Sequence, residues 1–340
     1  MMRDHHKLLW IAAGLALVGG IAFFSFGQSF FVEWAGTRGA PLNLVPPAQV
    51  ESKLVFLGDI MLSRGIGAMA VKNSDFGYPA RLIAADLAGV DLLMANLENP
   101  VSTRGTKVGS IYSFRADPKM LEALKVLGVD LVTLANNHIW DYGSVAAKDT
   151  LANLAQQGLD FVGAGVDYTA AHRAVVRIVK DTKIAFLGYT NLIPAPVTTT
   201  ESKPAVAFID KSVIEQDINA IRAEADLVVV NFHWGNEYKV KHNDFQEQIA
   251  KDTLAAGADL IVGHHPHVPQ ELVEYDEGYV AYSLGNFIFD QNFSEDTRHG
   301  LALEVTVKDK KIVDAQTREV LFTKDFQPYF AAAESGQPEN

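Results

Sequence analysis

Residues 257–270 read GADLIVGHHPHVPQ, and this stretch carries the pattern that decides the fold. A short apolar run at 259–262 follows a Gly-Ala pair that ends a helical pattern, and it predicts a buried strand. His264, His265 and His267 follow, and they are hard to bury because each neutral ring has a donor and an acceptor to satisfy. Strand ends are where α/β proteins place binding sites, and neutral imidazole is a common metal ligand. On its own, the stretch fits a metal site and an exposed loop equally well.

An Asp-Leu pair between a helical pattern and a strand recurs along the chain. It occurs in the opening stretch and again in GVDLLMANLENP (89–100), GVDLVTLANNH (128–138) and EADLVVVNFHWG (224–235). Two further strands are predicted by KLVFLGD (53–59) and KIAFLGYTN (183–191). Strands that alternate with helices indicate an α/β domain. Residues 301–322 alternate apolar and polar positions and predict an antiparallel hairpin that turns at 308–311, so we expect mixed sheets.

The N-terminus predicts a membrane anchor. Residues 8–27 contain no charged side chain, and as a helix they would span about 30 Å, the thickness of a bilayer core. Arg3 and Lys7 precede this run, which places the N-terminus in the cytoplasm and the rest on the outer face, periplasmic or extracellular. A cleaved signal peptide is the alternative, but the run is long and no A-x-A-like site follows it. We therefore expect a single-pass protein of the cytoplasmic membrane.

The predicted domains follow from this segment and from the composition of the two ends. We expect a cytoplasmic tip and transmembrane anchor at 1–31, a Gly- and Pro-containing linker at 32–52, a folded domain at 53–326 and a polar tail at 327–340. The net charge of −12 argues against a nucleic-acid partner. The absence of cysteine excludes disulfides, thiolate metal sites and a cysteine nucleophile.

Polar residues follow each predicted strand. They are Asp59; Asn96 and Glu98; Asn136, Asn137, His138 and Asp141; His233 and Glu237; the three histidines of the opening stretch; and Asn286 and Asp290. Each has an ordinary explanation alone, such as a turn or a helix cap. If the strands pair, however, all of them converge at one sheet edge. Carboxylate, amide and imidazole ligands without sulfur suit one or two divalent ions of Mn, Fe or Zn, and a pair of such ions can support in-line hydrolysis.

Several segments together resemble a known family. They are FLGDIMLSRGIG (56–67), ANLENPVSTRG (95–105), YSFRADP (112–118), LANNHIWDYG (134–143), VGAG (162–165), NFHWGNEY (231–238), GADLIVGHHPHVPQ (257–270) and YSLGNFIFDQ (282–291). In this order they resemble the CapA-type proteins of bacterial capsule and poly-γ-glutamate synthesis, a branch of the calcineurin-like metallophosphatase superfamily. The resemblance covers roughly residues 53–291 and implies a layered α/β/β/α fold with a metal site at the sheet edges.

The resemblance also implies roles for individual residues. The implied metal ligands are Asp59, Glu98, Asn137, His233, His265 and His267. His138 is the implied catalytic residue, which binds phosphate or protonates the leaving group. The first superfamily motif usually reads Asp-x-His, but here Met61 stands in the histidine position, so one metal position lacks a ligand. His264 is an additional histidine whose role the resemblance does not define.

We assign substrate binding to Arg115, Glu237 and Asn286. Arg115 would bind an anion through its guanidinium, or else form a salt bridge with Asp117 or Glu122. Two functions remain open. One is a membrane-anchored metal-dependent hydrolase that acts on a phosphoester or a polymer bond. The other is a non-enzymatic accessory protein that binds and exports an anionic polymer such as poly-γ-glutamate, alongside other membrane proteins of capsule synthesis.

Overall fold

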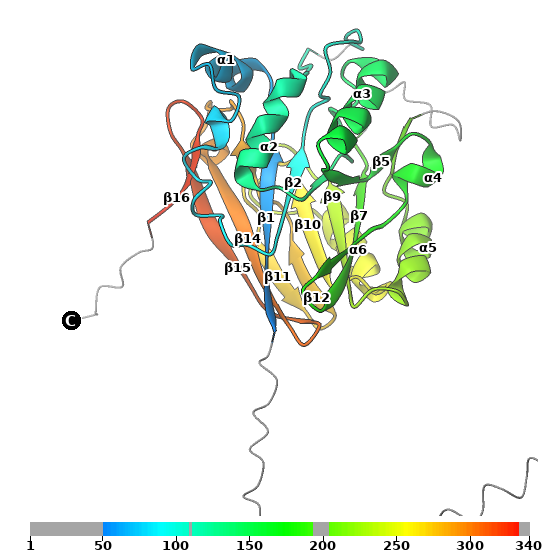
Figure 1. The fold of residues 1–340 in the computed structure, drawn as a ribbon. Helices are drawn as coiled ribbons and strands as arrows, with labels where there is room; N and C mark the ends of the chain where they lie inside the picture. The colour runs from blue at the N-terminus through cyan, green and yellow to red at the C-terminus, as the bar shows by residue number, and fades with distance from the viewer. Residues whose placement is uncertain (1–49, 109–110, 193–203, 333–340) are drawn as a thin grey trace, which may run out of the picture. The chain divides into compact units, whose positions relative to one another are not determined.

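The computed structural model describes residues 50–108, 111–192 and 204–332 (Figure 1). Its first sheet has the strand order β16-β15-β14-β1-β2-β3-β4, with β13 also paired to β1. The bounds of these strands are β1 (Glu51–Ile60), β2 (Leu92–Leu97), β3 (Leu131–Thr133), β4 (Asp160–Val162), β13 (Asn286–Ile288), β14 (His299–Lys308), β15 (Lys311–Phe322) and β16 (Pro328–Phe330). The pairs from β1 to β4 are parallel and β14 pairs with β1 antiparallel, so the predicted mixed sheet is confirmed.

The second sheet has the order β11-β12-β10-β9-β7-β6. Its strands are β6 (Val175–Val179), β7 (Thr182–Thr190), β9 (Leu227–His233), β10 (Leu260–His264), β11 (Leu272–Tyr275) and β12 (Gly278–Ala281). A small two-stranded sheet joins β5 (Ala164–Gly165) to β8 (Ala205–Val206). β7, β9, β10 and β12 run parallel to one another, so the carboxyl ends of β9 and β10 lie at one edge.

Helices cover the outer face of each sheet. The α-helices are α1 (Arg64–Lys72), α2 (Leu121–Leu127), α3 (Gly143–Gln156), α4 (Tyr168–Ala171), α5 (Lys211–Arg222) and α6 (Asp244–Ala255). Short 3₁₀ turns form at η1 (Tyr78–Ala80), η2 (Pro118–Met120) and η3 (Asp296–Arg298). Side chains of α1, α2 and α3 share one apolar cluster with the first sheet, and those of α5 and α6 share another with the second sheet.

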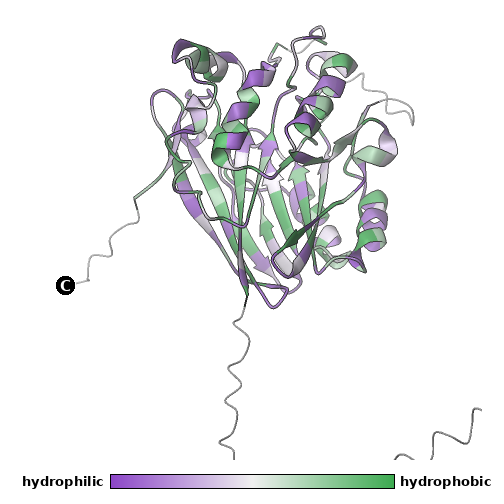
Figure 2. Ribbon diagram, viewed as in Figure 1, coloured by the Kyte–Doolittle hydropathy of each residue, from purple (hydrophilic) through white to green (hydrophobic). Residues whose placement is uncertain are grey.

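A third apolar cluster lies between the two sheets. In β1, Leu54 and Phe56 belong to this central cluster, whereas Val55 and Leu57 belong to the cluster under the helices, because successive side chains of a strand point to opposite faces. In Figure 2 the helices carry both hydrophilic and hydrophobic residues, as expected of helices with one face on a sheet and the other in solvent. The layers therefore run helix, sheet, sheet, helix, as the family resemblance implies.

The Asp-Leu repeat has a structural explanation. The four aspartates lie just before β2, β3, β9 and β10, and each side chain accepts a backbone N–H of the neighbouring strand. The bonds join Asp91 to Lys53 at 2.8 Å, Asp130 to Leu93 at 2.9 Å, Asp226 to Lys183 at 2.8 Å and Asp259 to Val228 at 2.7 Å. In each case the backbone N–H of the aspartate also donates to the carbonyl of the same partner residue. The repeat therefore fixes the register between neighbouring parallel strands at their amino ends.

Two of the predicted boundaries need comment. β16 lies beyond Phe326, and Phe330 packs into the core under the helices, so the folded domain extends further than the sequence predicted. The predicted anchor at 8–27 lies outside the described residues. Within the described ranges, no helix has the length and apolarity needed to cross a bilayer.

Candidate metal centre

Residues at the carboxyl ends of four strands from both sheets meet in one buried cluster. Asp59 is near the end of β1, Glu98 directly follows β2, and His233 ends β9. His265 and His267 follow the end of β10. Asp59 and Glu98 have no exposed surface, and the three histidines are at most 5% exposed. The predicted convergence is found, but not at the edge of one sheet: strand pairing brings β1 beside β2 and β9 beside β10, and the packing of the two sheets brings these pairs of strand ends together.

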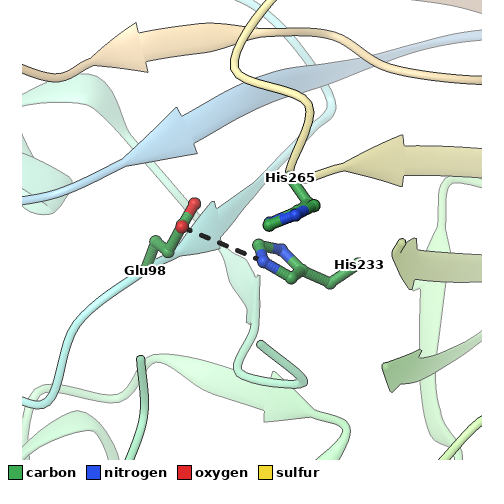
Figure 3. Close-up of side chains that lie close together, drawn as sticks. All are labelled: Glu98, His233 and His265. Atoms are coloured by element: carbon green, nitrogen blue, oxygen red, sulfur yellow. Dashed lines mark ion pairs between the residues drawn. The ribbon is translucent and has the colours of Figure 1, made fainter. Parts of the chain in front are cut away.

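Two groups of donors share the Glu98 carboxylate. Glu98, His233 and His265 form one group, drawn in Figure 3, and Asp59, Glu98 and His267 form the other; in each group one ligand atom per residue lies within 4.8 Å of the others. Asn137 joins the first group, because its Oδ1 lies 2.8 Å from His233 Nε2. All six residues that the resemblance implied as metal ligands are thus brought together.

The charges of the cluster call for a cation. Burial raises the pKa of Glu98 well above its usual range, and the neighbouring Asp59 and Glu237 add to the effect. Glu98 Oε1 is buried without a hydrogen-bond partner, although it lies 3.6 Å from His267 Nε2 and 3.9 Å from His233 Nε2. A buried carboxylate oxygen without a partner is costly, and a divalent ion among these donors would remove that cost.

The histidines have the protonation state that metal binding requires. Burial lowers the pKa of His233 well below its usual value, and burial together with the neighbouring His267 lowers the pKa of His265 to about 3. Both rings are therefore neutral at pH 7, and neutral imidazole is the form that binds metal. His265 Nδ1 is also buried without a partner. The donor set fits a divalent metal ion.

Asp59 is held as a carboxylate by its neighbours. Burial opposes ionisation, but the contacts with His264 and His267 outweigh it and hold the pKa of Asp59 well below its usual range. His264 Nδ1 lies 3.3 Å from Asp59 Oδ1, and His267 Nδ1 lies 3.3 Å from Asp59 Oδ2. His264, whose role the sequence left undefined, is thus a buried neighbour of Asp59.

Two asparagines that the sequence did not assign position the ligands. Asn96 Nδ2 donates to Asp59 Oδ1 at 2.8 Å and to Glu98 Oε2 at 3.2 Å. Asn136 Nδ2 donates to Asn96 Oδ1 at 3.1 Å, and Asn136 Oδ1 accepts the backbone N–H of His138 at 3.1 Å. Asn96 lies near the end of β2 and Asn136 follows β3, in the same motifs as the candidate ligands, and that placement was the available signal.

His138 lies beside the cluster with its ring orientation fixed. Nδ1 lies 2.8 Å from Asp141 Oδ2, and Nε2 lies 3.8 Å from Glu98 Oε1. The ring packs against Phe114 with a centroid distance of 4.1 Å. The Asp141 carboxylate accepts a hydrogen bond, so Nδ1 carries the proton and Nε2 is presented toward the cluster.

The predicted substrate-binding residues lie in three different environments. Asn286 is fully buried; Oδ1 lies 3.1 Å from His267 Nδ1 and Nδ2 donates to the carbonyl of Thr297 at 3.0 Å. It therefore orients His267 and offers no surface to a substrate. The exposed Glu237 has a carboxylate oxygen within 4.8 Å of the nearest ring nitrogens of His265 and His267.

The Arg115 side chain makes its contacts with neighbouring loop residues. Its Nη1 donates to the carbonyls of Arg104 at 2.9 Å and Gly105 at 3.2 Å, and the guanidinium lies 4.1 Å from the centre of the Tyr142 ring. Across the described ranges, no ion pair joins Arg115 to Asp117 or Glu122, so neither predicted salt bridge forms. Asp117 instead caps η2 by accepting the N–H of Lys119, as its sequence position predicts.

Met61 does not replace the missing histidine as a ligand. Its side chain is fully buried, and its sulfur accepts the backbone N–H of Ser63 at 3.1 Å and the Ser63 hydroxyl at 3.0 Å. The group of Asp59, Glu98 and His267 therefore has one donor fewer than the group that contains Asn137.

Comparisons with known proteins identify the family of this chain. Residues 53–291 match the family model described as "Bacterial capsule synthesis protein PGA_cap". The "Capsule biosynthesis protein CapA" of Bacillus anthracis is 35% identical over 249 residues, which cover 71% of this chain and 60% of that protein. The "PGA biosynthesis protein CapA" of Bacillus subtilis (strain 168) is 33% identical over 289 residues, which cover 83% of this chain and 74% of that protein.

A solved structure shares the fold. The crystal structure of a phosphatase from Mycoplasma pneumoniae aligns with a TM-score of 0.50 at 15% identity, and it covers 80% of this chain and 94% of that one. At this identity the likeness concerns the fold alone. This chain also spans less than two thirds of the length of the Bacillus anthracis relative.

Proposed function

This chain belongs to the bacterial capsule synthesis protein family PGA_cap, and from that premise we propose that it is a membrane-anchored, metal-dependent hydrolase of capsule or poly-γ-glutamate biosynthesis. Its substrate would be a phosphoester or a bond of the polymer. One observation carries the proposal: Glu98 Oε1 is buried without a hydrogen-bond partner among neutral imidazoles. The names of the two Bacillus relatives support the biological process.

The donor set selects the kind of metal. Carboxylate, amide and imidazole groups without sulfur suit Mn, Fe or Zn. When bound, one or two such ions lower the pKa of a coordinated water and stabilise negative charge on a phosphoryl or carbonyl oxygen. The shared Glu98 would hold both ions, while Asn96 keeps the carboxylates of Asp59 and Glu98 in place through its amide nitrogen.

His138 would serve as the proton donor. Asp141 keeps the proton on Nδ1, so that a second proton on Nε2 can pass to the oxygen of the leaving group. Phe114 packs against the ring and limits its rotation. The backbone N–H of Phe114 also donates to Asp141 Oδ2 at 2.7 Å, which joins the two supports of His138 in one network.

The membrane anchor is part of the proposal and rests on residues 8–27, preceded by Arg3 and Lys7. It would place the metal centre on the outer face of the cytoplasmic membrane, where other membrane proteins of capsule synthesis are expected partners. Protease added to spheroplasts should then digest the chain from about residue 41 onward, and complete protection would contradict this orientation.

Turnover of a chromogenic phosphodiester tests the proposed activity. The full-length chain is stripped of metal, reloaded with Mn²⁺ and assayed with bis(4-nitrophenyl) phosphate. We expect turnover that depends on Mn²⁺ and that Glu98→Gln abolishes. Glu277→Gln, an exposed glutamate in the turn between β11 and β12, is the matched control. A protein that binds Mn²⁺ tightly but turns over neither this diester nor poly-γ-glutamate would support the accessory, polymer-binding alternative.

A further inference from the structure

The two donor groups that share Glu98 are unequal. Asn137, His233 and His265 complete one group with Glu98, whereas the other has only Asp59 and His267 beside it. A protein site for Mn, Fe or Zn is completed either by a further side chain or by water. Met61 cannot supply the further ligand, because its sulfur accepts hydrogen bonds from the backbone N–H and the hydroxyl of Ser63. The incomplete group is therefore open to a water molecule or to a donor from elsewhere in the fold.

Glu237 is the acidic residue that the fold brings beside His267, the histidine of this group. It lies in the segment after β9, and one of its carboxylate oxygens lies within 4.8 Å of a ring nitrogen of His265 and of His267, a spacing that two donors to one ion can have. It is also one of the neighbouring charges that raise the pKa of Glu98, which places it close to the shared carboxylate. No carboxylate other than Asp59, Glu98 and Glu237 appears in the candidate ligand groups of the described ranges.

The backbone fixes Glu237 relative to the two histidines. The N–H of the next residue, Tyr238, donates to the carbonyl of Pro266 at 2.8 Å, and Pro266 lies between His265 and His267. Tyr238, His265 and His267 all have positive φ, at 63°, 98° and 58°. Such conformations cost about 1–3 kcal/mol each in non-glycine residues and persist where the surroundings impose them, often at functional sites. Three of the nine non-glycine residues with positive φ in the described ranges thus lie in the two loops that carry Glu237, His265 and His267.

The charge balance supports the same role. Three acidic side chains, those of Asp59, Glu98 and Glu237, take part in overlapping groups of donors around His265 and His267. Carboxylates held this close repel one another unless cations lie between them. If Glu237 served only to bind an anionic substrate, its negative charge would repel that substrate.

We propose that Glu237 is a metal ligand, which completes the group of Asp59, Glu98 and His267 in place of the donor that is missing at Met61. The inference rests on the proposed metal centre and replaces the substrate-binding role that the sequence suggested for Glu237. Glu237 is exposed, whereas the other ligands are buried, so it forms the ligand at the mouth of the site.

Metal stoichiometry tests this assignment directly. The full-length chain, stripped of metal, is titrated with Mn²⁺ by calorimetry, and bound metal is measured by elemental analysis. We expect two ions in the wild-type protein. In Glu237→Gln one ion should bind at least ~10–100-fold more weakly. Replacing a residue that only hydrogen-bonds a metal ligand typically lowers metal affinity by that much, and the loss of a ligand itself should lower it at least as much. Glu237→Asp keeps the charge but shortens the reach, and should give an intermediate affinity.

Matched variants separate ligation from a general charge effect. Glu277→Gln removes the same charge from an exposed site at the amino end of β10, and should bind two ions as the wild type does. His233→Ala should weaken the other ion, so the double variant Glu237→Gln/His233→Ala should bind neither tightly. Electron paramagnetic resonance should show a spin-coupled Mn²⁺ pair in the wild type and an isolated ion in Glu237→Gln.

The outcomes distinguish this inference from the proposed activity. Wild-type Mn²⁺ binding by Glu237→Gln, or an equal loss in Glu277→Gln, would overturn the role of Glu237 whatever the turnover. Two ions in the wild type with one lost in Glu237→Gln would support it even if no diester is hydrolysed. In that case only the hydrolase proposal fails. Circular dichroism of Glu237→Gln confirms that the loss of metal does not reflect unfolding.

Discussion

Two neighbours of His138 fix the orientation of its ring, and a third lies on the side of the candidate metal centre. Asp141 and Phe114 orient the imidazole, while Glu98 lies 3.8 Å from its free nitrogen. Asn137, the adjacent residue, points instead to His233. One loop thus carries a proposed metal ligand, Asn137, and beside it the proposed proton donor, His138.

Replacing His138 should therefore separate catalysis from metal binding. We expect His138→Ala to lower kcat by roughly 10²–10⁴-fold, the usual contribution of a general acid, while the bound Mn²⁺ stays near the wild-type amount. Steady-state kinetics and elemental analysis on the same preparation make the comparison. If metal and activity fall in parallel, His138 supports the loop and has no separate role in proton transfer.

The contacts of Arg115 predict an effect on stability. Arg115→Lys keeps the charge but loses the planar group that bonds two carbonyls and covers Tyr142. We expect the free energy of unfolding to fall by about 1 kcal/mol and KM to change little. Urea denaturation measures the first and diester kinetics the second. Lys107→Ala is the control, an exposed change in the segment that carries the two carbonyls. A raised KM in Arg115→Lys, but not in Lys107→Ala, would restore the substrate-binding interpretation.

The sequence predicts which residues cluster better than it predicts the contacts of their neighbours. Asp59, Glu98 and His233 sit at or directly after apolar strands, so strand pairing accounts for Asp59 beside Glu98, and the packing of the two sheets adds His233. The orientation of Arg115 and Asn286 depends on how their loops fold back. Arg115 turns to carbonyls ten and eleven positions earlier in the chain, and no local pattern reports such a contact.

At the level of strands, the Asp-Leu repeat explains how distant segments align. Each aspartate carboxylate bonds a backbone N–H of the adjacent strand at its amino end. Because side chains alternate between faces, a slip of one residue would turn the wrong face of a strand to the core. When the register is fixed at the amino ends of the strands, it is also fixed which residues lie at their carboxyl ends, where the candidate ligands are found.

The stability that the Asp226 bond to the neighbouring strand contributes should depend on pH. The N–H of Lys183 and the Lys310 side chain lower the pKa of Asp226. A carboxylate with a depressed pKa in the folded state adds stability above its unfolded pKa of about 4, and that stability is lost as the pH falls through the folded value. Asp226→Asn should therefore be less stable than the wild type at pH 7 by up to about 1 kcal/mol, with a difference that shrinks below pH ~4.

Chemical denaturation between pH 2.5 and 7 measures this difference. Asp276→Asn, an exposed change in the turn between β11 and β12, should show no such dependence. A constant gap between Asp226→Asn and the wild type over the whole range would mean that the bond to Lys183 does not depend on the charge.

Element boundaries show what a sequence pattern can resolve. The alternation at 301–322 predicts the hairpin of β14 and β15, and the observed turn lies between Lys308 and Lys311 as expected. β16 was missed because three residues are too few for an alternation to be recognised. It follows a turn in which Phe326 has a positive φ of 62°, a conformation that phenylalanine gives no reason to expect.

For the whole molecule, the metal centre joins the two halves of the fold. Asp59 and Glu98 come from the first sheet, and the histidines come from the second. The alternating strands and helices predict both sheets, but which sheet a strand joins depends on packing between distant segments. The family resemblance supplied the layering that the residue patterns alone left open.

Because both sheets contribute ligands, metal should stabilise the entire domain. An ion that binds only the folded state adds about 4 kcal/mol when its concentration is a thousand times its Kd. We expect Mn²⁺ to raise the Tm of the metal-free protein by several degrees. Scanning calorimetry should find this increase in His299→Ala, which lies on β14 outside the cluster, but a much smaller one in His265→Ala. An equal increase in both variants would mean that the ion binds elsewhere.

The direction of β1 has a consequence for access. The chain enters this 10-residue strand at Glu51 and reaches Asp59 near its other end, about 26 Å away at about 3.3 Å per residue. Residue 50 therefore lies at the end of β1 that is remote from the candidate metal centre. If the chain is anchored through its N-terminal residues as proposed, its substrate would be bound at the strand end opposite the one from which the anchor extends.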